Sequence, residues 1–390
     1  MNVSLLNLKA QYAGLKPEIE AKVLEVIASQ QFVLGPEVEA LEKEVAALSG
    51  TAHAVGVSSG TDAILVALMA LEVGPGDAVL TTPFTFFATA GTIARLGARP
   101  VFADIDPVTF NLDPVRAREA LSAFRKKEPG VRVKAVLPVH LYGQCADMDA
   151  FLALGRDEGL AVVEDAAQAI GADYPSGSGV RKAGACGHAG TLSFYPTKNL
   201  GGFGDGGMVL TNDPGLGRRL RKLRTHGETE RYFYDEVGGN FRLDALQAAV
   251  LRVKLRHLPE WQKKRRALAA AYSRKFAETG LEVEGAVVPP SAVYEFSGAT
   301  DYHTFHQYVI RAADRDGLRE FLRENGVGTA VFYPLPLHLQ KCFASLGYGP
   351  GDLPVAEKAS KEVLALPVHA ELRTDEQDYV VDKIREFYSR

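Results

Sequence analysis

A single lysine stands between a short apolar run and a glycine-rich turn in the segment 193–200, Ser-Phe-Tyr-Pro-Thr-Lys-Asn-Leu. Upstream, an apolar strand pattern ends on Asp165, and the segment 58–62, Ser-Ser-Gly-Thr-Asp, leads from another strand into a helix. Pyridoxal phosphate requires an amine that forms a Schiff base, a helix start that holds the phosphate and a carboxylate that meets the ring nitrogen. The three segments together therefore predict a site for this cofactor.

Lys198 by itself is ambiguous, because most lysines are solvated surface charges. Here the apolar run before it places the lysine at the end of a strand, and the glycines after it let the backbone pass close to a bound group. These glycines are not typical of a nucleotide-binding loop, since Gly202-x-Gly204-x-Gly206 is followed by a strand pattern rather than a helix. The local sequence thus leaves two readings, a catalytic amine in a cleft or a surface charge.

Asp165 supports the catalytic reading, because ligands of open α/β sheets bind beyond the carboxyl ends of the strands. A carboxylate there can keep a pyridinium nitrogen protonated, and Gln168, three residues on, could touch the ring hydroxyl. The alternative is that Asp165 caps a following helix, which is the commoner use of such a residue.

The segment 58–62 offers free backbone N–H groups at a helix start, and Gly60 and Thr61 lie where a phosphate would approach them. Ser193 could add its hydroxyl to the same phosphate. Phe86, in an aromatic cluster, could stack on a planar ring. The alternatives are a plain N-cap for the first segment and a core position for the aromatic residue.

Composition argues against several partners. The net charge of −4 does not suggest a nucleic-acid partner, and the basic runs 218–224 and 263–266 are typical of solvated helix faces. The nine histidines show no metal-ligand spacing, so we predict no metal site. The three cysteines are widely spaced, which favours a reducing compartment. With neither a signal peptide nor an apolar stretch of membrane-spanning length, the sequence predicts a cytoplasmic protein without a membrane partner.

Short apolar strands alternate with helices over the first part of the chain, which favours an α/β fold with a mostly parallel sheet covered on both faces. The expected strands are 54–57, 78–80, 100–102, 135–138, 161–163, 191–194 and 208–210. We predict a large cofactor-binding domain over residues 1–250, with an N-terminal helical arm. A smaller α+β domain is expected over 251–390, with strands near 305–310 and 329–332.

Taken in order, the segments resemble the DegT/DnrJ/EryC1/StrS sugar aminotransferase family over almost the whole chain. The similar segments begin at Gly35, Ser58, Pro83, Phe102, Pro138, Glu164, Ser193, Gly204 and Asn240. No one of them is decisive, but the ordered set is very specific.

This resemblance implies the aspartate-aminotransferase-like fold, fold type I of pyridoxal phosphate enzymes, and a homodimer with shared active sites. Lys198 would carry the cofactor, Asp165 would pair with the ring nitrogen and Gln168 would lie near the ring oxygen. The other implied residues are Gly60, Thr61 and Ser193 at the phosphate, Phe86 on the ring, Asn240 reaching the partner's phosphate, and Arg242 as a tentative substrate contact.

The implied activity is transfer of an amino group from L-glutamate to a nucleotide-linked keto hexose, in amino sugar biosynthesis. The segment 140–149 resembles members that aminate C3 of the sugar. Alternatives are amination at C4 or of a cyclitol, and a non-catalytic regulatory member. The sequence leaves open the nucleotide, the sugar, the pathway and any assembly beyond a dimer.

Overall fold

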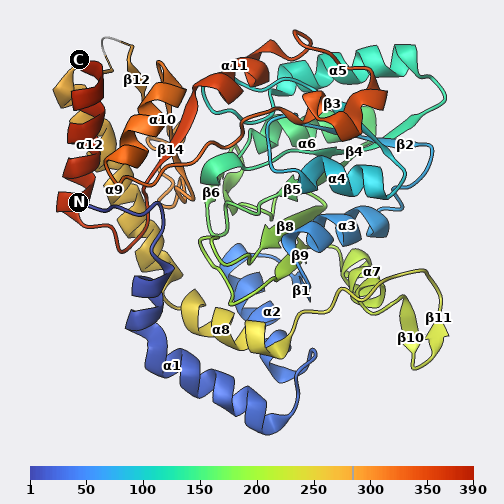
Figure 1. Cartoon of the computed structure of the whole chain (residues 1–390). Coiled ribbons are helices and arrows are strands. Elements are labelled where there is room, and N and C mark those ends of the chain that lie inside the picture. The colour runs from blue at the N-terminus through green and yellow to red at the C-terminus, as the bar shows by residue number, and fades with distance from the viewer. Residues whose placement is uncertain (283–284) are drawn as a thin grey trace.

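A computed structural model describes residues 1–282 and 285–390, and its centre is a seven-stranded sheet (Figure 1). In chain order these strands are β1 (His53–Val57), β2 (Asp77–Thr81), β3 (Arg99–Phe102), β4 (Arg132–Leu137), β5 (Ala161–Asp165), β8 (Ala189–Ser193) and β9 (Gly207–Thr211). Their spatial order is β1-β9-β8-β5-β4-β2-β3, with β9 antiparallel to both neighbours and every other pairing parallel. The predicted, mostly parallel sheet is confirmed.

Both faces of the sheet are covered, because successive side chains of a strand point to opposite sides. On β9, Met208 and Leu210 pack into one core, whereas Val209 packs into the other. The first core includes residues of α2 (Pro36–Ser49), α5 (Pro114–Lys127), α6 (Met148–Glu158) and α8 (Ala245–Leu255). The second includes residues of α3 (Gly60–Ala70), α4 (Ala88–Arg95) and α7 (Pro214–Arg224). Burial on both sides explains why the strands read as continuous apolar runs.

The C-terminal part has an antiparallel sheet and a core of its own. Its strands are β12 (Val287–Val288), β13 (Tyr308–Ala312) and β14 (Val363–Leu366). Its helices are α9 (Leu258–Thr279), α10 (Arg315–Glu324), α11 (Pro354–Glu362) and α12 (Thr374–Tyr388). The boundary between domains 1–250 and 251–390 stays a prediction.

Some predicted elements were misplaced. The expected strand 329–332 is absent from this described stretch, where only Ala330 forms an isolated bridge, to Ala365. Pro259 stands in the first turn of α9, where its missing N–H has no intrahelical partner to lose. The expected strand 305–310 begins only at Tyr308, which leaves the residues before it free to line a site.

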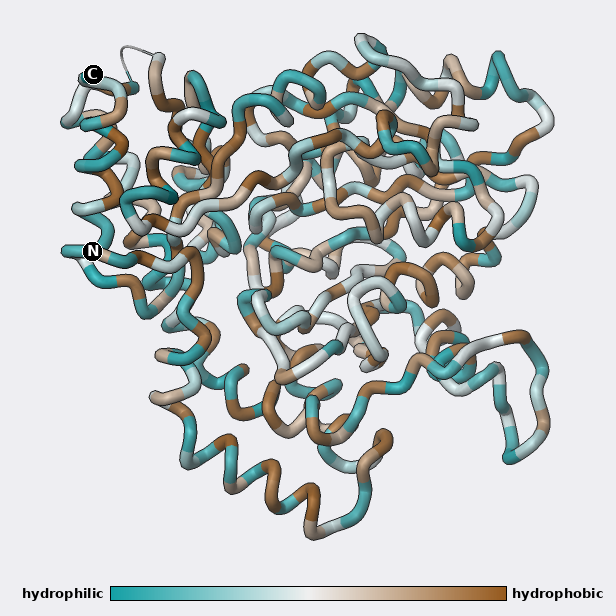
Figure 2. Tube along the Cα trace, viewed as in Figure 1, coloured by the Kyte–Doolittle hydropathy of each residue, from teal (hydrophilic) through white to brown (hydrophobic). Residues whose placement is uncertain are grey.

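Two segments lie at the margin of the molecule. Helix α1 (Leu8–Ser29) packs along α8, and Figure 2 shows apolar and polar residues alternating along it. The hairpin of β10 (Glu228–Glu230) and β11 (Phe233–Tyr234) projects from the body (Figure 1) and leads into Val237, which is 91% exposed. No helix in the described part of the chain combines the length and apolar character needed to cross a membrane.

Candidate cofactor site

The predicted site residues gather at the carboxyl edge of the central sheet. Strands β5 and β8 are parallel neighbours, with Asp165 opposite Thr191, so Asp165 and Ser193 follow one another along this edge. Lys198 stands five residues beyond Ser193, in the loop that leaves β8. Parallel pairing thus brings Asp165 near Ser193 and Lys198, which follow it by 28 and 33 positions in the chain.

The first residues of α3 are in contact with the end of β8. Ser59 caps the helix by accepting the N–H of Asp62 at 3.0 Å, and Gly60 is the first helical residue. A Cβ atom added at Gly60 would lie only 2.5 Å from the Cβ of Ser193. The two therefore touch, and together with Thr61 they form a helix start and a hydroxyl side by side, an arrangement suited to a phosphate.

Gly60→Ala should weaken binding of pyridoxal phosphate by about tenfold, because the added methyl group pushes the helix start away from Ser193. Fluorescence titration of the cofactor-free protein measures this. The control is Gly74→Ala, whose added Cβ would meet nothing within 4 Å. Unchanged affinity in Gly60→Ala would contradict the prediction.

Asp165 is 5% exposed and its carboxylate has two donors. Thr89 donates its hydroxyl to Oδ2 at 2.8 Å, and the N–H of Ala167 donates to Oδ1 at 3.2 Å. The described residues 166–172 form turns and no helix, so the alternative that Asp165 is a helix cap is wrong. A buried carboxylate held from both oxygens is suited to meet a cationic ring nitrogen.

Burial lowers the pKa of Lys198 to about 8, while the negative charge of Asp165 opposes that shift. The neutral amine is the nucleophile, so a lowered pKa makes more of it available near neutral pH. This favours the catalytic reading of Lys198 over a solvated surface charge.

In protein freed of cofactor, we expect the rate at which Lys198 forms a covalent adduct with pyridoxal phosphate to rise with pH and reach half its maximum near pH 8. The direction follows because raising the pH removes the ammonium proton that blocks attack. Stopped-flow absorbance from pH 6 to 10.5 measures it. A rate still climbing steeply above pH 10 would match a solvated lysine and contradict the prediction.

Gln168 is held in one orientation by two neighbours. Its Oε1 accepts the N–H of Tyr142 at 2.6 Å, and its Nε2 donates to the hydroxyl of Tyr333 at 3.3 Å. Tyr333 comes from the C-terminal part of the chain and is partly buried, and the burial of its hydroxyl raises its pKa well above the usual value. Sequence reasoning missed Tyr333, because only the folded chain brings it beside Gln168.

His306 is a second neighbour that sequence reasoning missed. The amide of Asn199 donates from Nδ2 to the carbonyl of Thr304 at 3.1 Å, so its Oδ1 faces Nδ1 of His306 at 2.9 Å. An amide oxygen only accepts, and His306 must therefore carry its proton on Nδ1 and leave Nε2 as an acceptor. Burial, helped by the positive charge of Lys198, holds the pKa of His306 well below its usual value, which keeps the ring neutral.

The remaining predicted site residues, Phe86, Asn240 and Arg242, are held by fewer contacts than Asp165 and Gln168. Phe86 is 58% exposed, in the turn before α4. Arg242 forms an isolated bridge with Val57, just before the α3 start, whereas the exposed Asn240 bridges Thr225. Among the described residues, Asn240 makes no hydrogen bond to the α3 start or to Ser193, so this chain's own fold does not bring it into their contact.

A buried polar cluster supports the end of β5. Glu164 accepts a hydrogen bond from His140 Nε2 at 2.8 Å, and both side chains are fully buried. The same carboxylate accepts the N–H groups of Gly184, Cys186 and Gly187 at 2.7–2.9 Å. Glu164 thereby ties the loop before β8 to the strand that carries Asp165.

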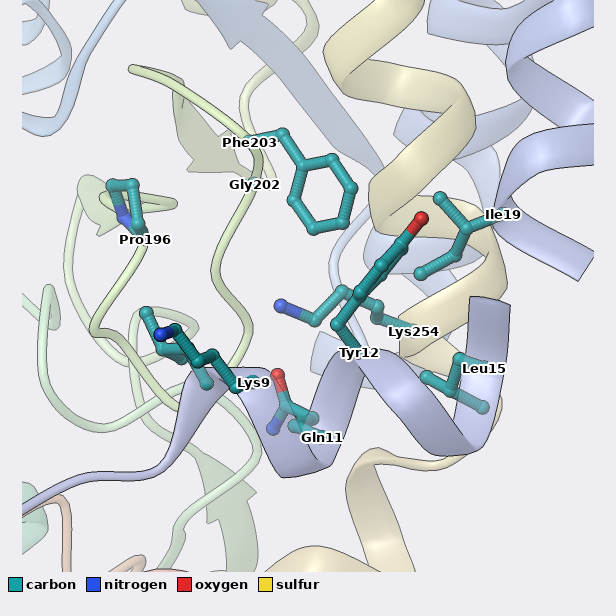
Figure 3. Close-up of a pocket in the computed structure, with 10 residues that line it drawn as sticks. Lys9, Gln11, Tyr12, Leu15, Ile19, Pro196, Gly202, Phe203 and Lys254 are labelled. Carbon is teal, nitrogen blue, oxygen red and sulfur yellow. The ribbon is translucent and has the colours of Figure 1, made fainter. Parts of the chain in front are cut away.

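A cavity of about 450 Å³ lies between α1 and the loop that follows Lys198 (Figure 3). Tyr12, Phe203 and Lys254 line it, and the amine of Lys254 donates to the carbonyl of Gly201. The predicted site residues are not among those that line it. The cavity therefore adjoins the candidate site without sharing its residues. No group of three His, Cys, Asp or Glu side chains within residues 1–282 and 285–390 is arranged to hold a metal ion.

Comparison with known proteins gives a consistent result. The family model described as DegT/DnrJ/EryC1/StrS aminotransferase family matches residues 14–385. The chain is 53% identical over 388 residues to a Geobacillus stearothermophilus protein named pleiotropic regulatory protein, with 100% of this chain and 99% of that protein covered. It is 41% identical over 383 residues to UDP-N-acetyl-3-dehydro-α-D-glucosamine 3-aminotransferase of Acidithiobacillus ferrooxidans, with 98% and 97% covered. Among solved structures, Streptomyces venezuelae DesV in complex with a ketimine intermediate matches with a TM-score of 0.91 and 41% identity, covering 100% of this chain and 99% of that one.

Proposed function

We propose that this chain, which belongs to the DegT/DnrJ/EryC1/StrS aminotransferase family, transfers an amino group from L-glutamate to the C3 keto group of a nucleotide-linked hexose. Members of this family are sugar aminotransferases that use pyridoxal phosphate. The cofactor, when bound, supplies an aldehyde that exchanges for an amine and a ring that accepts electrons. The fold is that of the matching aminotransferase structures.

The single observation that carries the proposal concerns the amine of Lys198. Burial lowers the pKa of this amine to about 8, and the amine lies close enough to Asp165 to feel its charge. In the proposed reaction Lys198 would hold the cofactor through its amine, and once freed by the amino donor it would move the donor's α-proton as base and acid. Asp165 would hold the proton on the ring nitrogen, and Gln168 would lie at the ring oxygen. Deamination of the donor and amination of the keto sugar are then the same proton transfer run in opposite directions.

The α3 start is proposed to hold the phosphate through Gly60 and Thr61, with the hydroxyl of Ser193 beside them. Phe86 is proposed to cover one face of the ring, and its exposure leaves room for it to do so. Arg242, which lies beside Val57, is proposed to contact a substituent of the sugar.

We further propose a homodimer in which Asn240 completes the partner's phosphate site. Asn240 follows the projecting hairpin. Large apolar side chains are exposed around that hairpin, on α1 and near the site. They are Leu24, Ile27, Phe86, Tyr195, Phe203, Tyr232, Phe233, Tyr234 and Val237. A surface with this much apolar area is typical of one that a partner covers. The cytoplasmic location and the absence of a nucleic-acid partner stay predictions.

Amination at C3 is supported by relatives whose names specify that position, such as the 3-aminotransferase of Acidithiobacillus ferrooxidans. The alternatives are a C4 or cyclitol aminotransferase, which would use the same cofactor residues. A regulatory role has one specific observation in its favour, the name of the Geobacillus stearothermophilus relative. The retained Lys198 and Asp165 favour catalysis, since regulation by itself requires neither an amine nor a ring-nitrogen partner.

The test has two stages. Purified protein loaded with pyridoxal phosphate should change its visible absorbance on addition of L-glutamate and release 2-oxoglutarate. A panel of nucleotide-linked keto hexoses, with the keto group at C3 or C4, is then assayed for amine products by mass. Ping-pong kinetics and a C3 product support the proposal, a C4 product or a cyclitol amine selects that alternative, and an inert protein favours the regulator.

A further inference from the structure

Thr89 lies where its hydroxyl can fix the orientation of the Asp165 carboxylate. It belongs to the first turn of α4 and is fully buried, and its hydroxyl reaches Asp165 Oδ2 at 2.8 Å. A threonine hydroxyl has one proton, and here that proton is donated to the carboxylate. A second hydroxyl, that of Thr85, lies 3.0 Å from the Thr89 hydroxyl and is 97% buried. Since Thr89 has already given its proton, Thr85 must be the donor of this second bond.

The donor-to-acceptor direction of the two hydrogen bonds, from Thr85 to Thr89 and from Thr89 to Asp165, is therefore fixed. Because these groups are buried, water has little access to replace either bond. Thr89 holds Oδ2 while the N–H of Ala167 holds Oδ1, so the plane of the carboxylate is set from both sides. Each carboxylate oxygen keeps a further acceptor site. The carboxylate is thus oriented in advance, with acceptor capacity left for one more donor.

The same turn carries Phe86. The N–H of Thr89 donates to the carbonyl of Phe86 at 3.3 Å, so the residue proposed to cover the ring face and the residue that orients Asp165 share one hydrogen-bonded turn. A displacement of this turn would disturb both contacts with the cofactor together.

We propose that Thr89, backed by Thr85, is a positioning residue that aims the Asp165 carboxylate at the cofactor's ring nitrogen. This inference rests on the proposed function, because it requires pyridoxal phosphate to be bound with its nitrogen at Asp165. Thr89 itself does not touch the cofactor and acts only through Asp165.

The experiment compares two cofactors, pyridoxal phosphate and its 1-deaza analogue, in which a C–H replaces the ring nitrogen. Thr89→Val, which keeps the shape and removes the hydroxyl, should weaken pyridoxal phosphate binding to the cofactor-free protein by about tenfold. The analogue cannot bond to Asp165 through that atom, so its affinity should change by less than about twofold. Thr89→Ser restores the hydroxyl and should bind both cofactors like the wild type.

Thr92→Val is the matched control. Thr92 is buried on the same helix, but its hydroxyl bonds to the carbonyl of Thr89 and not to Asp165, so both cofactors should bind as they do to wild type. If Thr89→Val does not fold, Thr85→Val should show the same dependence on the ring nitrogen with a smaller loss. Equal losses for both cofactors, or no loss for either, overturn the proposal. Wild-type protein that binds no pyridoxal phosphate would instead refute the proposed function.

Discussion

Lys198→Ala should lower the rate of amino transfer by at least about 10⁴-fold, because the variant lacks the buried amine near Asp165 that is proposed to bond to the cofactor and move the donor's α-proton. Pyridoxal phosphate should still bind to this variant, through the α3 start and Asp165. Borohydride reduction followed by peptide mapping should label Lys198 in the wild type and leave Lys198→Ala unlabelled. Steady-state assays with L-glutamate and a keto nucleotide sugar measure the rate.

Lys254→Met is a sharp control for this experiment. Burial lowers the pKa of Lys254 to about 8, as it does for Lys198, so pKa does not distinguish the two amines. Only the position of Lys198 near Asp165 does, and Lys254→Met should therefore keep its label on Lys198. A label on another lysine, or wild-type turnover by Lys198→Ala, would refute the assignment.

Glu164→Leu should also have a large effect, on stability: we expect it to lower the free energy of unfolding by about 3–5 kcal/mol. The substitution leaves His140 and three backbone N–H groups buried without their acceptor. Urea denaturation at pH 7, followed by circular dichroism, measures the loss. Glu164→Gln, which keeps one acceptor oxygen, should fall between this variant and the wild type.

The control is Glu119→Leu on α5, where an exposed glutamate pairs with the exposed Arg116. Such a pair contributes little, so the free energy of unfolding should stay within about 0.5 kcal/mol of the wild type. A loss of less than about 1 kcal/mol in Glu164→Leu would mean that the neighbouring donors find other acceptors, and the supporting role of Glu164 would be wrong.

Much of the sheet was predictable because its strands are buried on both faces and therefore read as apolar runs. All seven strands of the central sheet fall where the sequence places them, within three residues at each end. The position of Asp165 at the carboxyl end of a strand followed from the same pattern, since a polar residue directly after an apolar run marks the end of a strand. The contact between Gly60 and Ser193 joins two segments that the sequence predicts at the same phosphate.

The supporting residues were not predictable in this way. Thr89, Tyr333 and His306 act through contacts with residues distant in the chain, and no local pattern distinguishes them from other buried polar residues. The predicted strand 305–310 includes His306, but the strand begins two positions later. Tertiary packing, rather than propensity, decides where that strand begins.

The bond from Gln168 to Tyr333 has a consequence for biosynthesis. During translation the sheet residues leave the ribosome long before Tyr333, so a nascent chain presents Gln168 without the tyrosine that holds its amide. We therefore expect a fragment that ends before residue 333 to lack this bond and to retain pyridoxal phosphate less well than the full chain.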